Sequence, residues 1–442
     1  MRRLLLPLFV FTYACGAAPK PEPLSALPSV TFIEDDYPRA LAKARATKRP
    51  LFVDAWAEWC HTCLSLRAFV FPDPAISKKA GDFVWAAIDT EKPANAGFVS
   101  AHPMEAWPTL WVIDPSTETA VLRWNGSATA TELASLLDDA KLAMSRGDSG
   151  GQASAAYLRG NQETAAGKTN DAIVSYRLAL AAAPHEWPKR ARVVEALSSR
   201  LKANKDYEGC LALAALELPR MAPGTNAKSV AQDAIECLMS VPAGAGRAHE
   251  AEVLAAAERI AKDPRRSMLA DDRSDLYGAI VEGLTFLKRS DDAKRLARDW
   301  VALLEREAAN ATSPAARVVF DSHRYDAYRA LGEPERAVPM LTQSERDLPN
   351  DYNPPARLAG AYFAMDRYDD ALAAIDRALA RAYGPRKLRF YALKADILAK
   401  NGDKAAERAT VDQALDHARG LVLMGSILKV KAALEERKEK LR

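Results

Sequence analysis

The chain has 442 residues, of which 49% are hydrophobic and 27% are charged, and its formal net charge is +3. This is the composition of a globular protein, and the length is too great for one ordinary core, so two or three domains are expected. A net charge this small for the length does not indicate a nucleic-acid-binding protein, so no nucleic-acid partner is expected.

The N-terminal sequence predicts an export signal. Residues 1–14 (MRRLLLPLFVFTYA) have a basic start and an apolar stretch too short to span a bilayer, which indicates a secretory signal peptide. The next residue is Cys15, and Thr-Tyr-Ala-Cys resembles a bacterial lipoprotein box, which implies that Cys15 carries the lipid anchor. The alternative is a plain secreted protein with an unrelated cysteine. We expect an exported, periplasmic protein held at the membrane by its lipid.

Residues 15–29 follow as a tether. Their prolines (Pro19, Pro21, Pro23 and Pro28) alternate with small residues. Such a segment cannot join a hydrogen-bonded core, so it predicts an extended spacer between the membrane and the folded part.

The most informative stretch is residues 51–66 (LFVDAWAEWCHTCLSL). An apolar run typical of a buried strand leads into Cys60 and Cys63 just where a helical pattern begins. A Cys-x-x-Cys at such a junction is a redox signature. The N-terminus of a helix favours negative charge, so we expect Cys60 to form a thiolate and Cys63 to close or resolve the disulfide.

This segment resembles the active site of the thioredoxin superfamily. Asp54, Trp56, Trp59, Cys60 and Cys63 stand where the family pattern VDFWAxWCxxC places them. The resemblance implies that Asp54 is buried and relays a proton to or from Cys63, and that Trp59 covers the site.

Further landmarks of the same family occur in the right order downstream. Trp107, Pro108 and Thr109 resemble the strand with the cis-proline that borders the substrate groove, and Gly126 stands where a helix-preceding glycine is expected. The phrase FVFPDPAISKKA resembles the segment after the active-site helix in the C-terminal domain of bacterial thiol:disulfide interchange proteins.

The chain also departs from the family between its cysteines. His61 and Thr62 replace the Gly-Pro of thioredoxin, and a protonated histidine there stabilises the Cys60 thiolate and makes the disulfide more oxidising. Trp107 is unusually bulky for the residue before the cis-proline. These two changes leave open the reduction potential of the disulfide and the choice of substrate.

The remaining elements of this first domain complete an α/β unit over residues 30–145. A helix is expected over 37–48, strands over 83–88, 110–113 and 121–124, and a closing helix around Leu133, Leu136 and Leu137. Glycines and small polar residues then predict a linker over 146–152.

Beyond the linker the sequence becomes alanine-rich, poor in strands and repetitive. Gly167, Ala172, Tyr176 and Ala179 have the spacing of a tetratricopeptide repeat, a helical hairpin of about 34 residues. The pattern recurs most clearly at Leu358, Tyr362, Tyr368, Ala371 and Ala378. The region resembles that superfamily, with about seven units over 153–420 by this repeat length and a capping helix over 421–442. The expected fold is therefore an α/β thioredoxin-like domain followed by an all-α solenoid.

Cys210 and Cys237 are two further cysteines, both in the repeat region. Each falls at a buried position of neighbouring repeat units, so the sequence allows either a structural disulfide or two separately buried thiols.

Other kinds of site find no support in the sequence. Phosphate-binding loops, nucleophile elbows and zinc-protease motifs are missing, and the six histidines are scattered, so no metal site is expected. No cofactor is expected either, because the redox group is the Cys60–Cys63 disulfide itself.

These observations predict an exported thiol:disulfide oxidoreductase that reduces disulfides in protein substrates. The concave face of the repeats is expected to bind a partner or client protein. A reductant in an oxidising compartment would also need a membrane-associated electron donor. The alternative is a chaperone or assembly scaffold of the cell envelope whose thioredoxin-like domain is incidental.

Overall fold

The computed structural model describes residues 30–441 except 105, 147–150, 185, 243–246 and 266. The signal segment, Cys15 and the tether lie outside the described residues. The N-terminal α/β domain contains β1 (Phe32–Glu34), α1 (Tyr37–Thr47), β2 (Leu51–Trp56), α2 (His61–Ser65), the π-helical turn η1 (Leu66–Val70), α3 (Pro74–Ser77), β3 (Val84–Asp89), η2 (Pro93–Asn95), α4 (Ala96–Ala101), β4 (Thr109–Asp114), β5 (Thr119–Asn125) and α5 (Ala130–Arg146).

The five strands form one mixed sheet in the order β1-β3-β2-β4-β5. Strand β3 runs parallel to both β1 and β2, whereas β4 is antiparallel to both β2 and β5. Strand β2 is central, and its residues Leu51 to Ala55 are buried on both faces, as expected for a run of apolar residues without alternation. The chain leaves this strand directly into the Cys60–Cys63 loop.

Helices cover both faces of the sheet and give the domain three layers. One core lies against α1 and α4 and includes Leu41, Phe98 and Trp111. The opposite core lies against η1, α3 and α5 and includes Phe52, Leu66, Ile76, Trp85 and Leu137. The predicted strands and helices are present with ends shifted by a few residues, and β1 was missed because it has only three residues.

The rest of the described chain is a helical arm. Its helices are α6 (Gly151–Ala165), α7 (Thr169–Ala182), α8 (Arg190–Ala203), α9 (Tyr207–Glu217), α10 (Thr225–Ser240), α11 (Glu250–Ala261), α12 (Ala270–Phe286), α13 (Ser290–Ala309), α14 (Pro314–Val318), α15 (Asp321–Leu331), the 3-10 turn η3 (Pro334–Arg336), α16 (Ala337–Asp347), α17 (Asn353–Ala364), α18 (Tyr368–Arg381), α19 (Lys387–Lys400), α20 (Lys404–His417) and α21 (Ser426–Lys440). Several of them pack as successive antiparallel pairs: α6 with α7, α12 with α13, α17 with α18, and α19 with α20.

Small residues allow the paired helices to approach closely. In the first pair Ala172, Tyr176 and Ala179 are buried, and in a later pair Leu358, Ala371 and Ala378 are buried. Gly167 takes a left-handed conformation with φ 72°, which lets the chain turn between α6 and α7. Because each pair buries its face against the next, one core runs through most of the arm, and the last helices α19 to α21 bury a second cluster that includes Leu388, Val411 and Leu434.

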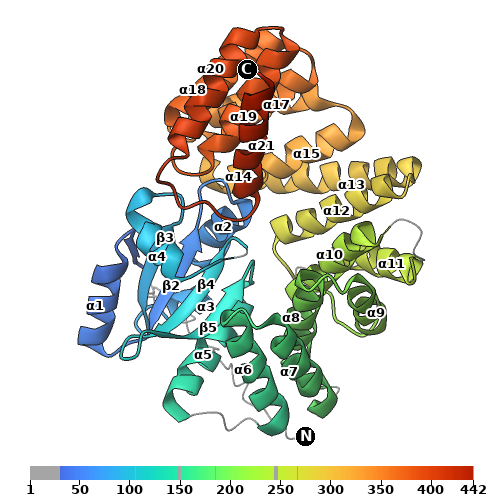
Figure 1. Ribbon diagram of the computed structural model, residues 1–442. Helices are drawn as coiled ribbons and strands as arrows, with labels where there is room; N and C mark the ends of the chain where they lie inside the picture. Colours follow the sequence, from blue (N-terminus) through green and yellow to red (C-terminus); the bar gives the residue numbers. More distant parts are fainter. Residues whose placement is uncertain are drawn as a thin grey trace, which may run out of the picture.

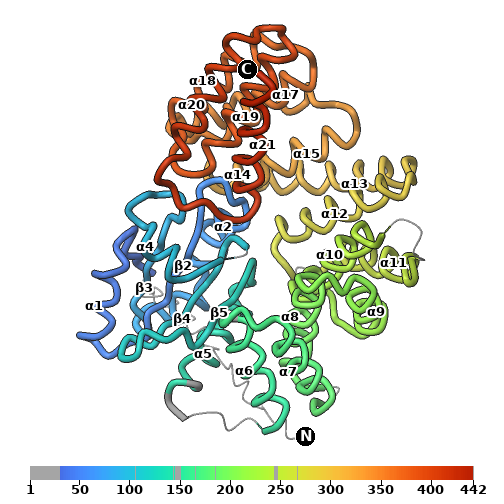
Figure 2. The backbone as a smooth tube through the Cα atoms, viewed as in Figure 1, coloured from blue at the N-terminus to red at the C-terminus, as the bar shows by residue number. Residues whose placement is uncertain are grey.

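The arm curves around one side of the α/β domain, from α6 beside the sheet to α21 above the active-site helix α2 (Figure 1). The tube drawing shows the same path of the backbone from the α/β domain through the arm (Figure 2). We call the helices α8, α10, α12, α15, α17 and α19 the inner face of the arm. Residues of these helices, or directly before them, contact the α/β domain, as described below.

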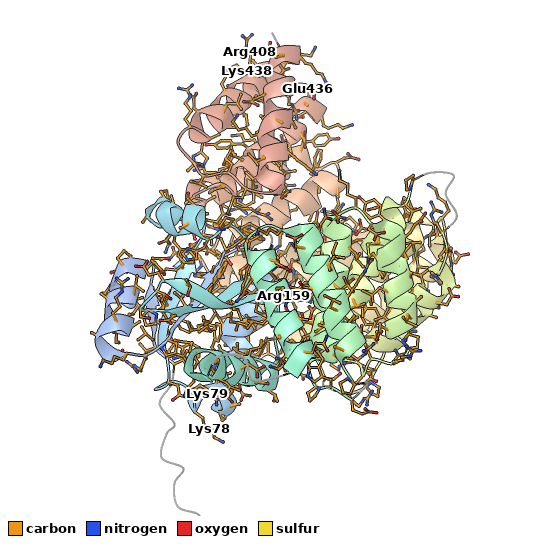
Figure 3. The ribbon with its side chains drawn as sticks, turned by 60° about the horizontal axis from the view of Figure 1, so that its bottom comes forward. Lys78, Lys79, Arg159, Arg408, Glu436 and Lys438 are labelled. Atoms are coloured by element: carbon orange, nitrogen blue, oxygen red, sulfur yellow. A yellow bond between two sulfur atoms is a disulfide. The ribbon has the colours of Figure 1, made fainter. Side chains whose placement is uncertain are left out.

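The end of the arm differs from the expected capping helix. The helix begins at Ser426, later than residue 421, because Gly425 takes φ 55° and residues 421–424 lack helical structure. Met424 of this segment packs against the core of the α/β domain. Figure 3 shows Glu436 and Lys438 of α21, with Arg408 of α20, at the far end of the molecule from the sheet, so the terminal charge run covers an outer face.

None of the helices in the described part of the chain is long and apolar enough to cross a membrane.

Candidate redox active site

Cys60 and Cys63 form a disulfide at the N-terminus of α2. Cys60 is the residue that caps this helix, and its Sγ accepts a hydrogen bond from the backbone N–H of Cys63 at 3.1 Å. Cys60 is 4% exposed and Cys63 is 0% exposed. Only Cys60 can therefore meet a substrate sulfur, and the helix end is placed to stabilise its thiolate after reduction.

Asp54 lies on β2 and is completely buried. Neither of its carboxylate oxygens has a hydrogen-bond partner among the described residues, and Nε of Arg67 lies 3.6 Å from Oδ2. Burial raises the pKa of Asp54 to about 7, although the Arg67 charge opposes this rise. A carboxyl group with such a pKa can take up or release a proton near neutral pH.

Arg67 of the π-helical turn η1 connects several of these groups. Its guanidinium lies 3.6 Å from the ring centre of Trp56, and its Nη2 lies 3.5 Å from Oε2 of Glu34. This π-helical turn widens the helix directly after the two cysteines. Such π-turns are frequent at functional sites.

The peptide bond between Trp107 and Pro108 is cis. The loop is held from both sides, because Thr109 donates its hydroxyl to the Ala106 carbonyl at 2.8 Å and Gly126 N–H donates to the Pro108 carbonyl at 2.8 Å. Nε1 of Trp107 donates to the hydroxyl of Thr90 at 2.8 Å. These bonds fix the loop that borders the disulfide.

Two tryptophans enclose the disulfide. The rings of Trp59 and Trp107 lie 5.3 Å apart and pack, with Trp56, against Ala57, Cys60 and Cys63. Nε1 of Trp59 donates to Oε1 of Glu91 at 3.0 Å. The Arg386 guanidinium of the arm lies 4.7 Å from the Trp59 ring centre, so the arm also holds this cover in place.

His61 points to the arm. Its Nδ1 lies 3.1 Å from Nε2 of His323 (α15) and 3.7 Å from Oδ2 of Asp271 (α12), and its Nε2 lies 3.5 Å from Oδ1 of Asp275 (α12). Burial alone would lower the pKa of His61, but the carboxylates of Asp275 and Asp271 outweigh it and raise the pKa above its ordinary value. Thr62 places its hydroxyl 3.2 Å from the same Nδ1.

A second contact joins the arm to the loop before the cysteines. Asn353 (α17) donates to the backbone oxygen of Glu58 at 3.2 Å, and the Tyr383 hydroxyl donates to Oδ2 of Asp89 at 2.6 Å and contacts Oε2 of Glu58 at 3.1 Å. Burial and the nearby Asp351 carboxylate raise the pKa of Glu58 to about 7. The backbone N–H of Arg386 donates to Oε2 of Glu91 at 2.6 Å.

The arm also contacts α5, on the far side of the sheet from α1. Arg192 (α8) donates to Asp139 at 3.0 Å, and the Thr225 hydroxyl (α10) donates to Glu132 at 2.9 Å. The inner face of the arm thus contacts the protein's own α/β domain at several points along its length. The sequence did not predict the arm residues at the active site, because nothing in their spacing links them to Cys60.

Cys210 and Cys237 also form a disulfide, between α9 and α10. Their Cα atoms are 6.5 Å apart and both residues are 0% exposed. Of the two readings that the sequence allowed, the structure has the bonded one, and its burial leaves no path for substrate.

The comparisons with known proteins also distinguish the α/β domain from the helical arm. Residues 32–115 match the family model described as thioredoxin-like, and residues 328–397 match a tetratricopeptide repeat model. Residues 32–115 form a thioredoxin-like domain. Tetratricopeptide repeats are present in the arm. The fold class expected from the sequence is therefore confirmed.

Two curated relatives match a stretch of the chain about as long as the thioredoxin-like domain. The thiol:disulfide interchange protein DsbD of Pseudoalteromonas atlantica is 32% identical over 82 residues, which is 18% of this chain and 14% of that protein. Thioredoxin C-3 of Corynebacterium nephridii is 34% identical over 89 residues, which is 20% of this chain and 57% of that protein. The chain thus spans a seventh of the first relative and somewhat more than half of the second.

Solved structures of helical-repeat proteins align with part of this chain. A tetratricopeptide repeat protein from Parabacteroides merdae is 12% identical, with a TM-score of 0.41, over 64% of this chain and 98% of that one. A thermophilic repeat protein from Thermus thermophilus is 18% identical, with a TM-score of 0.28, over 44% of this chain and 90% of that one.

The domain and its cysteine pair support thiol:disulfide oxidoreductase chemistry in general terms, with disulfide substrates, and the repeats indicate binding of a protein partner.

Proposed function

We propose that this protein is an exported, lipid-anchored thiol:disulfide oxidoreductase that reduces disulfides in protein substrates. The observation that carries the proposal is the Cys60–Cys63 disulfide at the N-terminus of α2, which packs beside Trp107 of the cis-proline loop. Export and anchoring rest on the sequence of residues 1–15 alone.

The reaction needs only the two cysteines as redox groups. In the reduced protein the Cys60 thiolate attacks one sulfur of the substrate disulfide, the S–S bond breaks, and the other substrate sulfur leaves as a thiolate. Cys63 then attacks Sγ of Cys60 in the mixed disulfide. The Cys60–Cys63 bond forms, the substrate leaves reduced, and two electrons have passed to it.

Asp54 would handle the proton of the second step. Cys63 must lose its thiol proton to attack, and Cys63 is completely buried. The carboxyl of Asp54, with its pKa raised to about 7 by burial, can accept this proton near neutral pH. The protein would then be recharged by a membrane-associated dithiol donor, because the periplasm itself is oxidising.

The arm would select the substrate. A cavity of about 340 Å³ lies between the cis-proline side of the domain (Ala106, Trp124 and Asn125) and the inner helices α8 and α10. Its lining carries both signs of charge and several aromatic rings: Arg192, Glu195, Lys202, Asp233, Tyr157 and Tyr176. Since it adjoins the cis-proline loop, this cavity could hold the chain on one side of the substrate cysteine.

The competing function is that of a chaperone or assembly scaffold of the cell envelope. The observation in its favour is the low exposure of the disulfide, with Cys60 at 4% under the Trp59 ring and the arm. In that case client binding would survive the replacement of both cysteines.

The reduction potential separates these functions. The chain from residue 30 onward is equilibrated with glutathione buffers, and the Cys60 and Cys63 thiols are counted by trapping. A potential of about −250 mV or lower makes the protein a reductant, whereas about −150 mV would make it an oxidase or isomerase. Failure to form the disulfide would favour the scaffold.

A trapping experiment tests the roles of the two cysteines. In a Cys63→Ser variant the mixed disulfide on Cys60 cannot be resolved, so substrate proteins should remain covalently attached. The matched control is a double Cys210→Ala, Cys237→Ala variant, which should retain full exchange activity. Equal trapping by Cys60→Ser would contradict the assignment of Cys60 as the attacking residue.

A further inference from the structure

A group of metal-ligating side chains lies where the arm meets the active-site loop. His61 of the loop, Asp275 of α12 and His323 of α15 each offer one ligand atom, and these atoms lie within 4.8 Å of one another. His323 and Asp275 have no part in the disulfide exchange proposed above. Their chemistry therefore needs a separate explanation.

The spacing of the atoms fits a shared cation. Nε2 of His323 lies 3.1 Å from Nδ1 of His61 and 3.9 Å from Oδ1 of Asp275, and Oδ2 of Asp271 lies 3.7 Å from the same Nδ1. One imidazole binds an ion through one nitrogen, so Nδ1 is the ligand atom of His61, and the 3.5 Å from its Nε2 to Oδ1 of Asp275 is not a separation between ligand atoms. Ligands bound at about 2.0–2.1 Å around a tetrahedral Zn²⁺ are separated by about 3.3 Å. The 3.9 Å between Asp275 and His323 is too long for a hydrogen bond, and Asp275 would move toward the ion to bind it.

Asp271 provides an independent indication. Its side chain is 1% exposed, and its Oδ1 accepts the hydroxyl of Ser65. Its Oδ2 is buried, accepts no hydrogen bond from the described residues, and faces Nδ1 of His61 at 3.7 Å. A buried carboxylate oxygen without a donor is costly, and a cation at this point would remove that cost.

Lys228 is the nearby positive charge that must be considered. Its Nζ lies 3.1 Å from Oδ2 of Asp275 and 3.5 Å from Oδ1 of Asp272. It therefore pairs with the oxygen of Asp275 that faces away from the histidines and with a different aspartate. Oδ1 of Asp275 and Oδ2 of Asp271 stay directed at His61.

We propose that His61, His323 and Asp275, completed by Asp271, form a binding site for a divalent transition metal ion, with Zn²⁺ as the best match. Two imidazoles with carboxylates are a common zinc ligand set. The ligands come from the active-site loop and from two helices of the arm, so the bound ion would fasten the arm to the loop between the cysteines.

The test uses the full-length protein with a Cys15→Ser substitution and both disulfides intact, so that no cysteine thiolate can bind the metal. Zn²⁺ alone is titrated into chelator-treated protein and the heat is recorded. The expected result is one Zn²⁺ per chain. Replacing a ligand should weaken binding by more than the 10- to 100-fold that loss of an outer partner causes, in both His323→Gln and Asp275→Asn. Co²⁺ should give the visible spectrum of a tetrahedral site with nitrogen and oxygen ligands.

A His249→Gln variant is the matched control, because His249 is exposed and lies in the arm away from the cluster. It should bind Zn²⁺ as the native chain does. Absence of binding by the native chain, or equal binding by the Asp275→Asn variant, would overturn the proposal. Circular dichroism verifies that each variant is folded, and Asp275→Asn decides the outcome if His323→Gln is not. Disulfide exchange measured in chelator is independent of this result.

Discussion

Nε2 of His323 lies 3.1 Å from Nδ1 of His61, although the two residues are 262 positions apart in the chain. His61 stands between the two redox cysteines, and His323 belongs to the arm. The arm therefore does more than extend from the thioredoxin-like domain, since it contributes to the surroundings of the disulfide itself.

The charge of His61 should raise the reduction potential of the Cys60–Cys63 pair. The carboxylates of Asp275 and Asp271 raise its pKa against the effect of burial, so the imidazolium persists at and above the ordinary value of 6.5. An imidazolium favours the Cys60 thiolate and hence the reduced protein. A His61→Gln variant, equilibrated with glutathione in chelator at pH 6, should have a potential lower by about 30 mV, which corresponds to about tenfold in the equilibrium constant.

The difference between His61→Gln and the native chain should shrink at high pH, where the native imidazole also loses its charge. His249→Gln should keep the native potential at every pH. An unchanged potential in His61→Gln would mean that the two carboxylates cancel the field of the imidazolium at Cys60.

Asp54 should make the stability of the domain decrease as pH rises. Burial raises its pKa from 3.8 to about 7. Between these values the unfolded chain has lost the proton that the folded chain retains, so each step up in pH favours unfolding. The native chain should therefore lose stability relative to Asp54→Asn between pH 4 and pH 7. The loss is at most about 4 kcal/mol, because one pKa unit equals about 1.4 kcal/mol.

Urea unfolding of the oxidised proteins at several pH values measures this loss. Asp138→Asn is the control, because Asp138 is an exposed carboxylate of α5 in the same domain. It should follow the native pH dependence. Parallel curves for Asp54→Asn and the native chain would show that Asp54 is ionised throughout.

Gly384 should be required for the arm to close on the domain. It takes φ +61°, and a Cβ there would overlap the backbone oxygen of Glu91 in the thioredoxin-like domain. Gly384→Ala should destabilise the protein beyond the roughly 1 kcal/mol expected for the left-handed backbone alone. It should also speed the reduction of the Cys60–Cys63 disulfide by a phosphine, because the cover over Trp59 is loosened.

Gly402 offers a matched comparison, since it takes φ +81° with no atom within 4 Å of its ideal Cβ. Gly402→Ala should show the backbone cost only, with the native rate of disulfide reduction. Equal reduction rates in the two variants would contradict a role of the Gly384 contact in covering the site.

The Cys210–Cys237 disulfide should stabilise the arm without affecting exchange. The bond joins α9 to α10 over a sequence separation of 27 residues. Constraint of a loop of this length in the unfolded chain stabilises the folded state by about 3.5 kcal/mol. The double Cys210→Ala, Cys237→Ala variant should unfold at lower urea concentration by circular dichroism, while its reduction potential at Cys60–Cys63 stays native. A native unfolding midpoint would show that the bond gives no net stabilisation.

Much of the fold was accessible from sequence patterns because the signals are local. Residues 51–66 contain a strand, a turn and a helix start within reach of one another, so the redox pair could be located from them. Gly167, Ala172 and Tyr176 likewise report on one helical hairpin. Strand β1 was missed because three residues carry too little periodicity, and the start of α21 was misplaced because Gly425 interrupts an otherwise helical pattern.

The arm residues around the active site could not be found in this way. Asp271, Asp275 and His323 are ordinary polar residues of amphipathic helices when read alone, and Tyr383 and Arg386 lie in a turn between two repeats. Whether these residues lie at the active site depends on the curvature of the stacked helix pairs. That curvature results from the packing of many side chains.

The sequence by itself determined the kind of chemistry and the kinds of element. A cysteine pair at a strand-to-helix junction and small residues at hairpin spacing act over a few positions, and local geometry follows from them. Only the tertiary structure decided that the arm folds back over the disulfide and places Asp271, Asp275 and His323 around His61. Each helix pair is rotated slightly relative to the pair before it, and these rotations together set the curvature of the solenoid. Whether an arm residue reaches the active site therefore depends on the packing of all the pairs that precede it.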